Sequence, residues 1–142
     1  MDSICSFFLF PMNRNKISLI LDDVLPKLEK KFGLSRYYKI KLNYYVIKNY
    51  YNGEDHCEFQ DSVKGIFDKE KVDGLINPWI EIYADNITCK KDLIKTILHE
   101  YCHYLQSPCW MARYYNMGHN YITHPYEVQA DQFEEKWYKE FL

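Results

Sequence analysis

One segment of the chain, residues 88–108, reads TCKKDLIKTILHEYCHYLQSP. Its apolar residues recur at intervals of three and four, a pattern typical of an amphipathic helix. Thr88 is a suitable N-cap before the first turn, and Pro108 ends the pattern. The apolar face of this helix consists of Leu93, Ile94, Ile97, Leu98, Tyr101, Cys102 and Leu105.

The same helix contains the sequence HEYCH at residues 99–103. Positions i and i+4 of a helix lie one above the other, so the imidazoles of His99 and His103 can bind one metal ion. Glu100 projects beside them and can accept a proton from a metal-activated water rather than bind the metal. The spacing therefore predicts a catalytic metal site.

A catalytic zinc site usually has three protein ligands and leaves one position open, so a third ligand is expected downstream. Glu127 and Asp131 are four residues apart and share one face of a helix. This spacing suggests that Glu127 binds the metal while Asp131 accepts the Nδ1 proton of a ligand histidine. The other candidates for the third ligand are Cys109, His119 and His124.

The segments before this helix predict a helix followed by strands. Apolar residues at helical spacing over 15–32 predict an N-terminal helix that ends at Gly33. Alternation over 38–51 predicts a strand, and Asn52-Gly53 predicts a hairpin to a short strand within 57–72. A second tight turn at Asp73-Gly74 leads to a strand at 79–83.

The segments after this helix predict a loop and a last helix. Residues 109–123 are aperiodic and are interpreted as a loop with at most a short helix. Pro125, a favoured first-turn residue, begins a helix that runs to the C-terminus. The order of helix, strands, helix, loop and helix predicts an α+β fold.

Composition restricts the class of protein. With 142 residues, 47% of them apolar, the chain is expected to form a single domain over 1–142, with residues 1–14 as an N-terminal arm. The net charge of −2 argues against binding nucleic acid through overall charge. No apolar run is long enough to cross a membrane, and no secretory signal is evident. The five irregularly spaced cysteines predict reduced thiols in a cytoplasmic protein.

The combination of H-E-x-x-H with a downstream helix bearing E-x-x-x-D resembles the gluzincin clan of zinc metallopeptidases, particularly its minimal single-domain members. Residues 123–131, THPYEVQAD, are similar to the N/H-P-x-E-x-x-A pattern at the start of the glutamate helix in that family. The resemblance covers roughly residues 79–137. It implies a zincin-like fold, with a small twisted sheet of three or more strands whose edge strand lies over the active-site helix. Residues 79–83 stand in the place of that edge strand, which pairs with extended substrate.

The resemblance also implies roles for individual residues. Zn²⁺ would be bound by His99, His103 and Glu127, Glu100 would be the general base, and Asp131 would support a ligand histidine. Larger gluzincins take an oxyanion-stabilising Tyr or His from a second subdomain, which is not expected in this chain. The candidates for that role here are Tyr115, His119 and Tyr121.

Other zincin families place the third ligand elsewhere. A metzincin has Gly and His where this chain has Gln106 and Cys109. A third histidine about fifteen residues after the motif resembles the Spartan-type proteases, and His119 stands near that position.

The sequence as a whole predicts a zinc-dependent endopeptidase that acts on a peptide or protein substrate. Peptide bonds would be hydrolysed through a metal-activated water, with Glu100 as general base. The alternatives are a Spartan-like protease with His119 as third ligand, and a catalytically weak zinc-binding module that recognises peptides.

Overall fold

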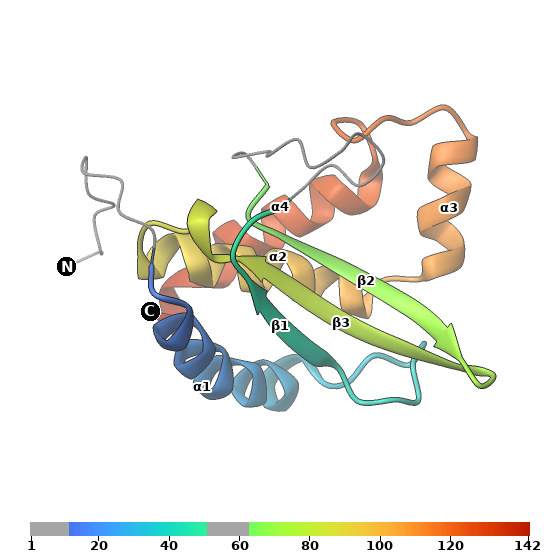
Figure 1. Cartoon of the computed structure of the whole chain (residues 1–142). Coiled ribbons are helices and arrows are strands. Elements are labelled where there is room, and N and C mark those ends of the chain that lie inside the picture. Colours follow the sequence, from blue (N-terminus) through green and yellow to red (C-terminus); the bar gives the residue numbers. More distant parts are fainter. Residues whose placement is uncertain (1–11, 51–62) are drawn as a thin grey trace.

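The computed structural model describes residues 12–50 and 63–142 (Figure 1). Residues 1–11 of the predicted N-terminal arm and the Asn52-Gly53 turn lie outside the described residues. The helices and strands are α1 (Arg14–Phe32), β1 (Asn43–Ile47), β2 (Gly65–Val72), β3 (Leu75–Tyr83), α2 (Lys90–Leu105), α3 (Pro108–Asn116) and α4 (Pro125–Trp137). Short 3₁₀ turns follow β3 and α4 at Ala84–Asn86 and Tyr138–Phe141.

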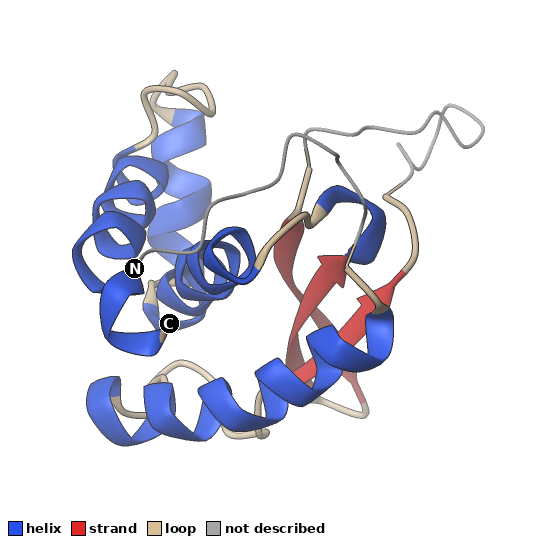
Figure 2. Ribbon diagram, turned by 90° about the vertical axis from the view of Figure 1, so that its left-hand side faces the viewer, coloured by secondary structure: helices blue, strands red, loops and turns tan. Residues whose placement is uncertain are grey.

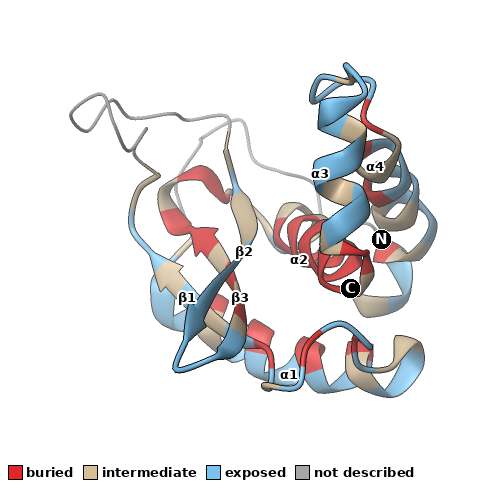
Figure 3. Ribbon diagram, turned by 90° about the vertical axis from the view of Figure 1, so that its right-hand side faces the viewer, coloured by how far each residue is buried: buried red, intermediate tan, exposed pale blue. Residues whose placement is uncertain are grey.

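The three strands form a mixed sheet with the order β1-β3-β2. The sheet lies on one side of the molecule, α2, α3 and α4 lie on the other, and α1 runs beneath the sheet (Figure 2). Helix α2 lies between the sheet and α4, with α1 crossing below (Figure 3). The prediction of an α+β fold with an N-terminal helix, a small sheet and a C-terminal helix packed on the motif helix is confirmed in this coarse form.

The helix ends follow local sequence signals with two exceptions. Helix α1 is capped by the side chain of Asn13, which accepts from the backbone N–H of Asn15, and it ends at Gly33 with φ +84°, as predicted. The N-cap of α2 is Cys89 rather than Thr88, and its side chain makes no capping hydrogen bond. Pro108 ends α2 and also begins α3, a helix of nine residues that occupies the first half of the segment interpreted as a loop with at most a short helix.

The sheet differs from the prediction in its pairing. The turn at Asp73-Gly74 has φ angles of +51° and +80°, which suits a tight hairpin between β2 and β3, as predicted. Strand β1 pairs with β3 in parallel and not with β2, so among the described residues the strand within 57–72 is not the hairpin partner expected for the 38–51 strand. Strand β3, which contains residues 79–83, is central, and β2 is the edge strand beside α2.

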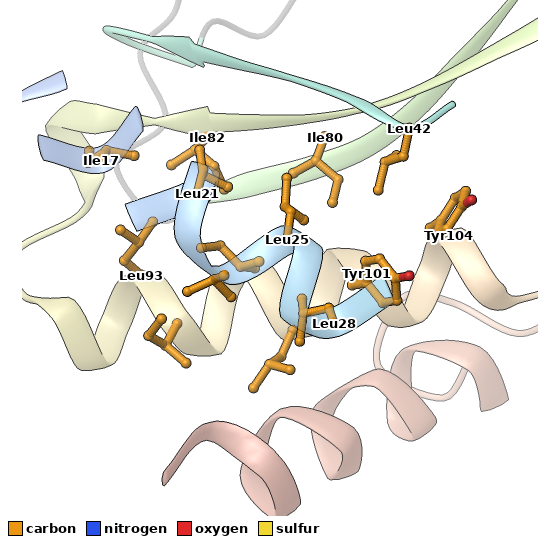
Figure 4. Packing of buried hydrophobic residues seen from close by; sticks show 14 of the residues in the cluster. Ile17, Leu21, Leu25, Leu28, Leu42, Ile80, Ile82, Leu93, Tyr101 and Tyr104 are labelled. Atoms are coloured by element: carbon orange, nitrogen blue, oxygen red, sulfur yellow. The ribbon is translucent and has the colours of Figure 1, made fainter. Parts of the chain in front are cut away.

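The core lies between the sheet and the helices (Figure 4). Ile80 and Ile82 alternate along β3 and are fully buried against the apolar faces of α1 and α2. Ala130, also fully buried, allows α4 to approach α2 closely, as its small side chain suggests. This packing fixes the buried face of α2 that carries the motif histidines.

The structure bears on the predicted state of the cysteines and on the predicted absence of a membrane-spanning segment. Cys89 is disulfide-bonded, whereas Cys102 and Cys109 are free thiols, so the prediction of five reduced thiols is wrong. Because disulfides are rare in a reducing cytosol, this weakens the basis on which a cytoplasmic location was predicted. Within residues 12–50 and 63–142, no helix is both long and apolar enough to span a membrane.

Candidate metal centre

Two helices supply the side chains of the candidate metal centre. His99, Glu100 and His103 lie on α2 and are each less than 10% exposed. Glu127 lies in the first turn of α4 and is 6% exposed. The start of α4 is fixed by His124, whose side chain accepts from the backbone N–H of Tyr126. The N-terminal turn of α4 therefore presents a carboxylate directly to the motif histidines.

The ligand atoms of three residues converge on one point. The two Nε2 atoms of His99 and His103 lie 3.2 Å apart. The Oε1 atom of Glu127 lies 3.4 Å from Nε2 of His99 and also contacts Nε2 of His103. Bonds of 2.0–2.1 Å to a tetrahedral ion separate the ligand atoms by roughly 3.4 Å. The three residues therefore form a buried group that can hold a metal ion.

The environment of Glu127 Oε1 agrees with this interpretation. The atom is buried, makes no hydrogen bond of acceptable geometry with the described residues, and lies against the two imidazole nitrogens. Burial of a carboxylate oxygen costs free energy unless a positive group or a donor lies beside it. A cation between Oε1 and the two imidazoles would offset this cost, and the donor set of two nitrogens and one oxygen fits zinc.

The tautomer of His99 is set by two carboxylates on α4. Its Nδ1 atom lies 3.0 Å from Oε1 of Glu134 and 3.3 Å from Oδ1 of Asp131. Ionised carboxylates only accept hydrogen bonds, so Nδ1 carries the proton. In the neutral ring, Nε2 then presents its lone pair to Glu127 and His103, as a metal ligand must.

The electrostatics of this group favour added positive charge. Burial lowers the pKa of His99, but its interactions with Glu127 and Glu134 outweigh this and raise it to about 10. Burial raises the pKa of Glu127, but its interactions with His103 and His99 outweigh this and lower it to about 2. Without a metal, protons on the imidazoles neutralise the carboxylates, and a bound cation would displace those protons.

Glu100 lies in the same cleft and is not part of the ligand group. Burial raises the pKa of its carboxyl group to about 7, against the opposing effect of His103 and His99. The backbone N–H of Phe67 on β2 also interacts with this carboxylate. A carboxyl group with a pKa near 7 can both accept and release a proton at neutral pH.

The cleft around these residues has a volume of about 920 Å³. Its walls come from β2 on one side and from α2, α3 and α4 on the other, with Gly65, Phe67 and Lys69 contributed by the edge strand. The backbone of β2 approaches α2 closely at Gly65, where an added Cβ would lie 2.8 Å from Cγ2 of Thr96. The edge strand thus runs directly beside the motif helix.

Only some of the other predicted site residues lie at the cleft. Tyr115 and Tyr121 line the cleft, whereas His119 does not. Nδ1 of His119 contacts Oγ1 of Thr123 within the loop before α4. Cys109 is exposed, and the side chain of His124 serves as the N-cap of α4. Among the described residues, the groups that can hold a metal contain none of His119, Cys109 and His124, so the alternative of His119 as third ligand gains no support.

Two contacts at the site were not predicted. Glu134 approaches His99, and Gln106 contacts His103. Glu134 lies seven residues after Glu127, so the spacing of 127, 131 and 134 places all three carboxylates on one helix face. This spacing is a signal that was available in the sequence. For Gln106 no comparable pattern exists, because it lies at the end of α2 and its side chain folds back.

The chain has no significant match among protein-family models, curated proteins or solved structures. The likeness to gluzincins therefore rests on the motif residues and on the geometry of this site. The fold and the site together establish an α+β chain in which buried His99, His103 and Glu127 form a group that can hold a metal ion.

Proposed function

We propose that this protein is a zinc-dependent endopeptidase. The observation that carries the proposal is the convergence of His99, His103 and Glu127 beside the buried carboxylate of Glu100 in one open cleft. Two histidines and one carboxylate, with a position left for water or substrate, are typical ligands of catalytic zinc in peptidases.

The ligand residues would hold the ion in a fixed orientation. When bound, zinc acts as a Lewis acid that polarises a carbonyl group and lowers the pKa of water. His99 and His103 would bind through Nε2 and Glu127 through its carboxylate. Glu134 and Asp131 keep the proton on Nδ1 of His99, which leaves Nε2 free to bind.

Glu100 would transfer the proton during hydrolysis. Its carboxylate accepts a proton from the attacking water and then donates it to the nitrogen of the departing amine. Burial raises the pKa of this carboxyl group, which favours its acceptance of a proton from water.

The edge strand β2 would bind the substrate backbone. Among the described residues β2 pairs only with β3, and its other edge faces the cleft through Gly65 and Phe67. An extended peptide can add to such an edge by main-chain hydrogen bonds. This arrangement would place a peptide bond beside Glu100. The edge strand that pairs with substrate would then be β2 and not residues 79–83, which the sequence suggested.

Tyr121 would stabilise the oxyanion. It lines the cleft although it is largely exposed, and desolvation together with the negative charge of Glu127 raises the pKa of its hydroxyl group to about 12. The phenol therefore keeps its proton at neutral pH and can donate a hydrogen bond to developing negative charge. Tyr115 lines the same cleft and is the second candidate.

Peptide-library digestion followed by mass spectrometry tests this proposal. Zinc-loaded wild type should cleave internal peptide bonds, a chelator should abolish cleavage, and added zinc should restore it. Glu100→Gln should retain zinc and lose at least about 10²-fold in rate. Full activity in that variant would contradict the mechanism. Zinc uptake without cleavage of any peptide would favour the zinc-binding recognition module instead.

A further inference from the structure

Gln106 occupies an unusual position beside the candidate metal centre. It is the C-cap residue of α2, three residues after His103, and its backbone N–H donates to the carbonyl of His103. Its side chain is only 7% exposed although it is polar and uncharged. A buried amide needs hydrogen-bond partners for both its oxygen and its nitrogen.

The backbone carbonyl of Tyr126 determines the orientation of the Gln106 amide. Nε2 of Gln106 lies 3.0 Å from the backbone carbonyl of Tyr126 and 2.8 Å from Oε1 of Gln129. The side chain of Gln129 can rotate its amide, but the carbonyl of Tyr126 can only accept a hydrogen bond. The nitrogen of Gln106 must therefore face α4, and its oxygen must face away from α4.

The oxygen of Gln106 points at the ring of His103. Oε1 lies 2.6 Å from Nδ1 of His103. Because this oxygen can only accept, Nδ1 must carry a proton, whether the ring is neutral or charged. In the neutral ring the lone pair is then on Nε2, the atom directed at His99 and Glu127.

From these contacts we infer that Gln106 is a positioning residue, which fixes His103 in its metal-binding tautomer and ties it to the start of α4. The carbonyl that orients Gln106 belongs to Tyr126, the neighbour of the third ligand Glu127. One amide therefore links a ligand on α2 to the backbone that places a ligand on α4. This inference rests on the zinc site of the proposed function.

Three variants separate this role from general packing. Gln106→Met keeps the side-chain length and removes both the acceptor and the donor. Gln106→Glu keeps an acceptor for Nδ1 of His103 and loses the donor to Tyr126. Gln132→Met makes the same chemical change at an exposed position of α4 and serves as the control. Thermal melting establishes that each variant folds.

Zinc affinity, measured by competition with a chromophoric chelator, is the first readout. Gln106→Met should bind zinc about 10- to 100-fold more weakly than wild type, as is typical for loss of a partner that orients a ligand. Gln132→Met should remain within about twofold of wild type. Equal affinity in Gln106→Met and wild type would overturn the inference.

The ring N–H signal of His103 is the second readout, and it does not require zinc. In ¹⁵N-histidine-labelled metal-free protein, Nδ1–H of His103 should exchange slowly with water. The signal should persist in Gln106→Glu and disappear in Gln106→Met. An Nδ1–H signal that persists in Gln106→Met would contradict the inferred hydrogen bond. If Gln106→Met does not fold, loss of the signal in Gln106→Glu would contradict it. Wild type that takes up no zinc would instead contradict the proposed function, and this signal alone would then test the hydrogen bond between Gln106 and His103.

Discussion

The carboxylate of Glu134 lies 3.0 Å from Nδ1 of His99, closer than that of Asp131 at 3.3 Å. The side chain of Glu134 is 20% exposed and that of Asp131 is 68% exposed. Interactions in the less exposed position are screened less by water. The sequence assigned the support of a ligand histidine to Asp131 alone. In the structure that histidine is His99, and Glu134 lies closer to it and is less exposed.

Alanine substitutions at these two positions test that ranking. Glu134→Ala should weaken zinc binding by about tenfold or more, and Asp131→Ala by less, because it removes the more solvent-exposed partner. The control is Glu135→Ala on the same helix, whose carboxylate pairs with Lys95 at the surface. Chelator competition measures all three affinities. A greater loss in Asp131→Ala than in Glu134→Ala would reverse the assignment.

Tyr121 is expected to act on the rate and not on the metal. Tyr121→Phe removes one hydroxyl group that can donate to an oxyanion, so kcat should fall about 10²-fold while zinc content is unchanged. The control is His119→Ala, because His119 does not line the cleft. Steady-state kinetics on a cleaved library peptide measures both variants. A normal kcat in Tyr121→Phe together with a reduced kcat in Tyr115→Phe would assign the role to Tyr115.

The stability of the metal-free protein should depend on pH. The pKa of His99 is raised from 6.5 to about 10, so its stabilising contribution is complete below pH 6.5 and is lost as the pH rises towards 10. The pKa of Glu100, raised from 4.5 to about 7, acts in the same direction over a lower range. The pKa of Glu127 is lowered from 4.5 to about 2, so its contribution is lost only as the pH falls below 4.5.

The melting temperature of metal-free protein should therefore fall between pH 6.5 and pH 10. Zinc-loaded protein should show a weaker dependence, because the cation replaces the protons on the imidazoles. Calorimetry at several pH values compares the two forms. A melting temperature of the metal-free form that rises over this range would contradict the charge arrangement described for the site.

Gly65 tests the position of the edge strand. In Gly65→Ala the new Cβ would lie 2.8 Å from Cγ2 of Thr96 and 3.0 Å from the backbone oxygen of Glu81. The free energy of unfolding should fall by about 1–3 kcal/mol, as in other overpacked sites. Adding Thr96→Ser removes the closest of these contacts and should restore part of the loss. Urea unfolding provides the measurement, and unchanged stability in Gly65→Ala would mean that β2 lies further from α2.

Helices α1, α2 and α4 and the residues of the candidate metal group could be predicted because their signals are local. The apolar spacing before Gly33 and around His99 defines two helices, and Pro125 marks the start of the third. The four-residue spacings of His99 with His103 and of Glu127 with Asp131 indicate shared helix faces. These signals depend on residues only a few positions apart, so they can be recognised without knowledge of the tertiary fold.

The strand pairing could not be predicted in the same way. The alternation in β1 shows that it is a strand but does not identify its partner, because parallel pairing with β3 is a long-range contact. The second half of β2, next to the hairpin turn, is exposed on both faces. Strand β2 therefore lacks the apolar alternation of a half-buried strand. The choice of the edge strand, and hence of the substrate-facing edge, therefore required the structure.

Zinc content per chain tests the central claim most directly. Elemental analysis of protein purified without chelator should find about one zinc per chain in wild type and much less in Glu127→Ala, because that variant loses one of three ligands. Glu135→Ala, the matched change on the exposed side of α4, should retain the wild-type content. Folded wild-type protein that holds no zinc, even after zinc is added, would contradict the account.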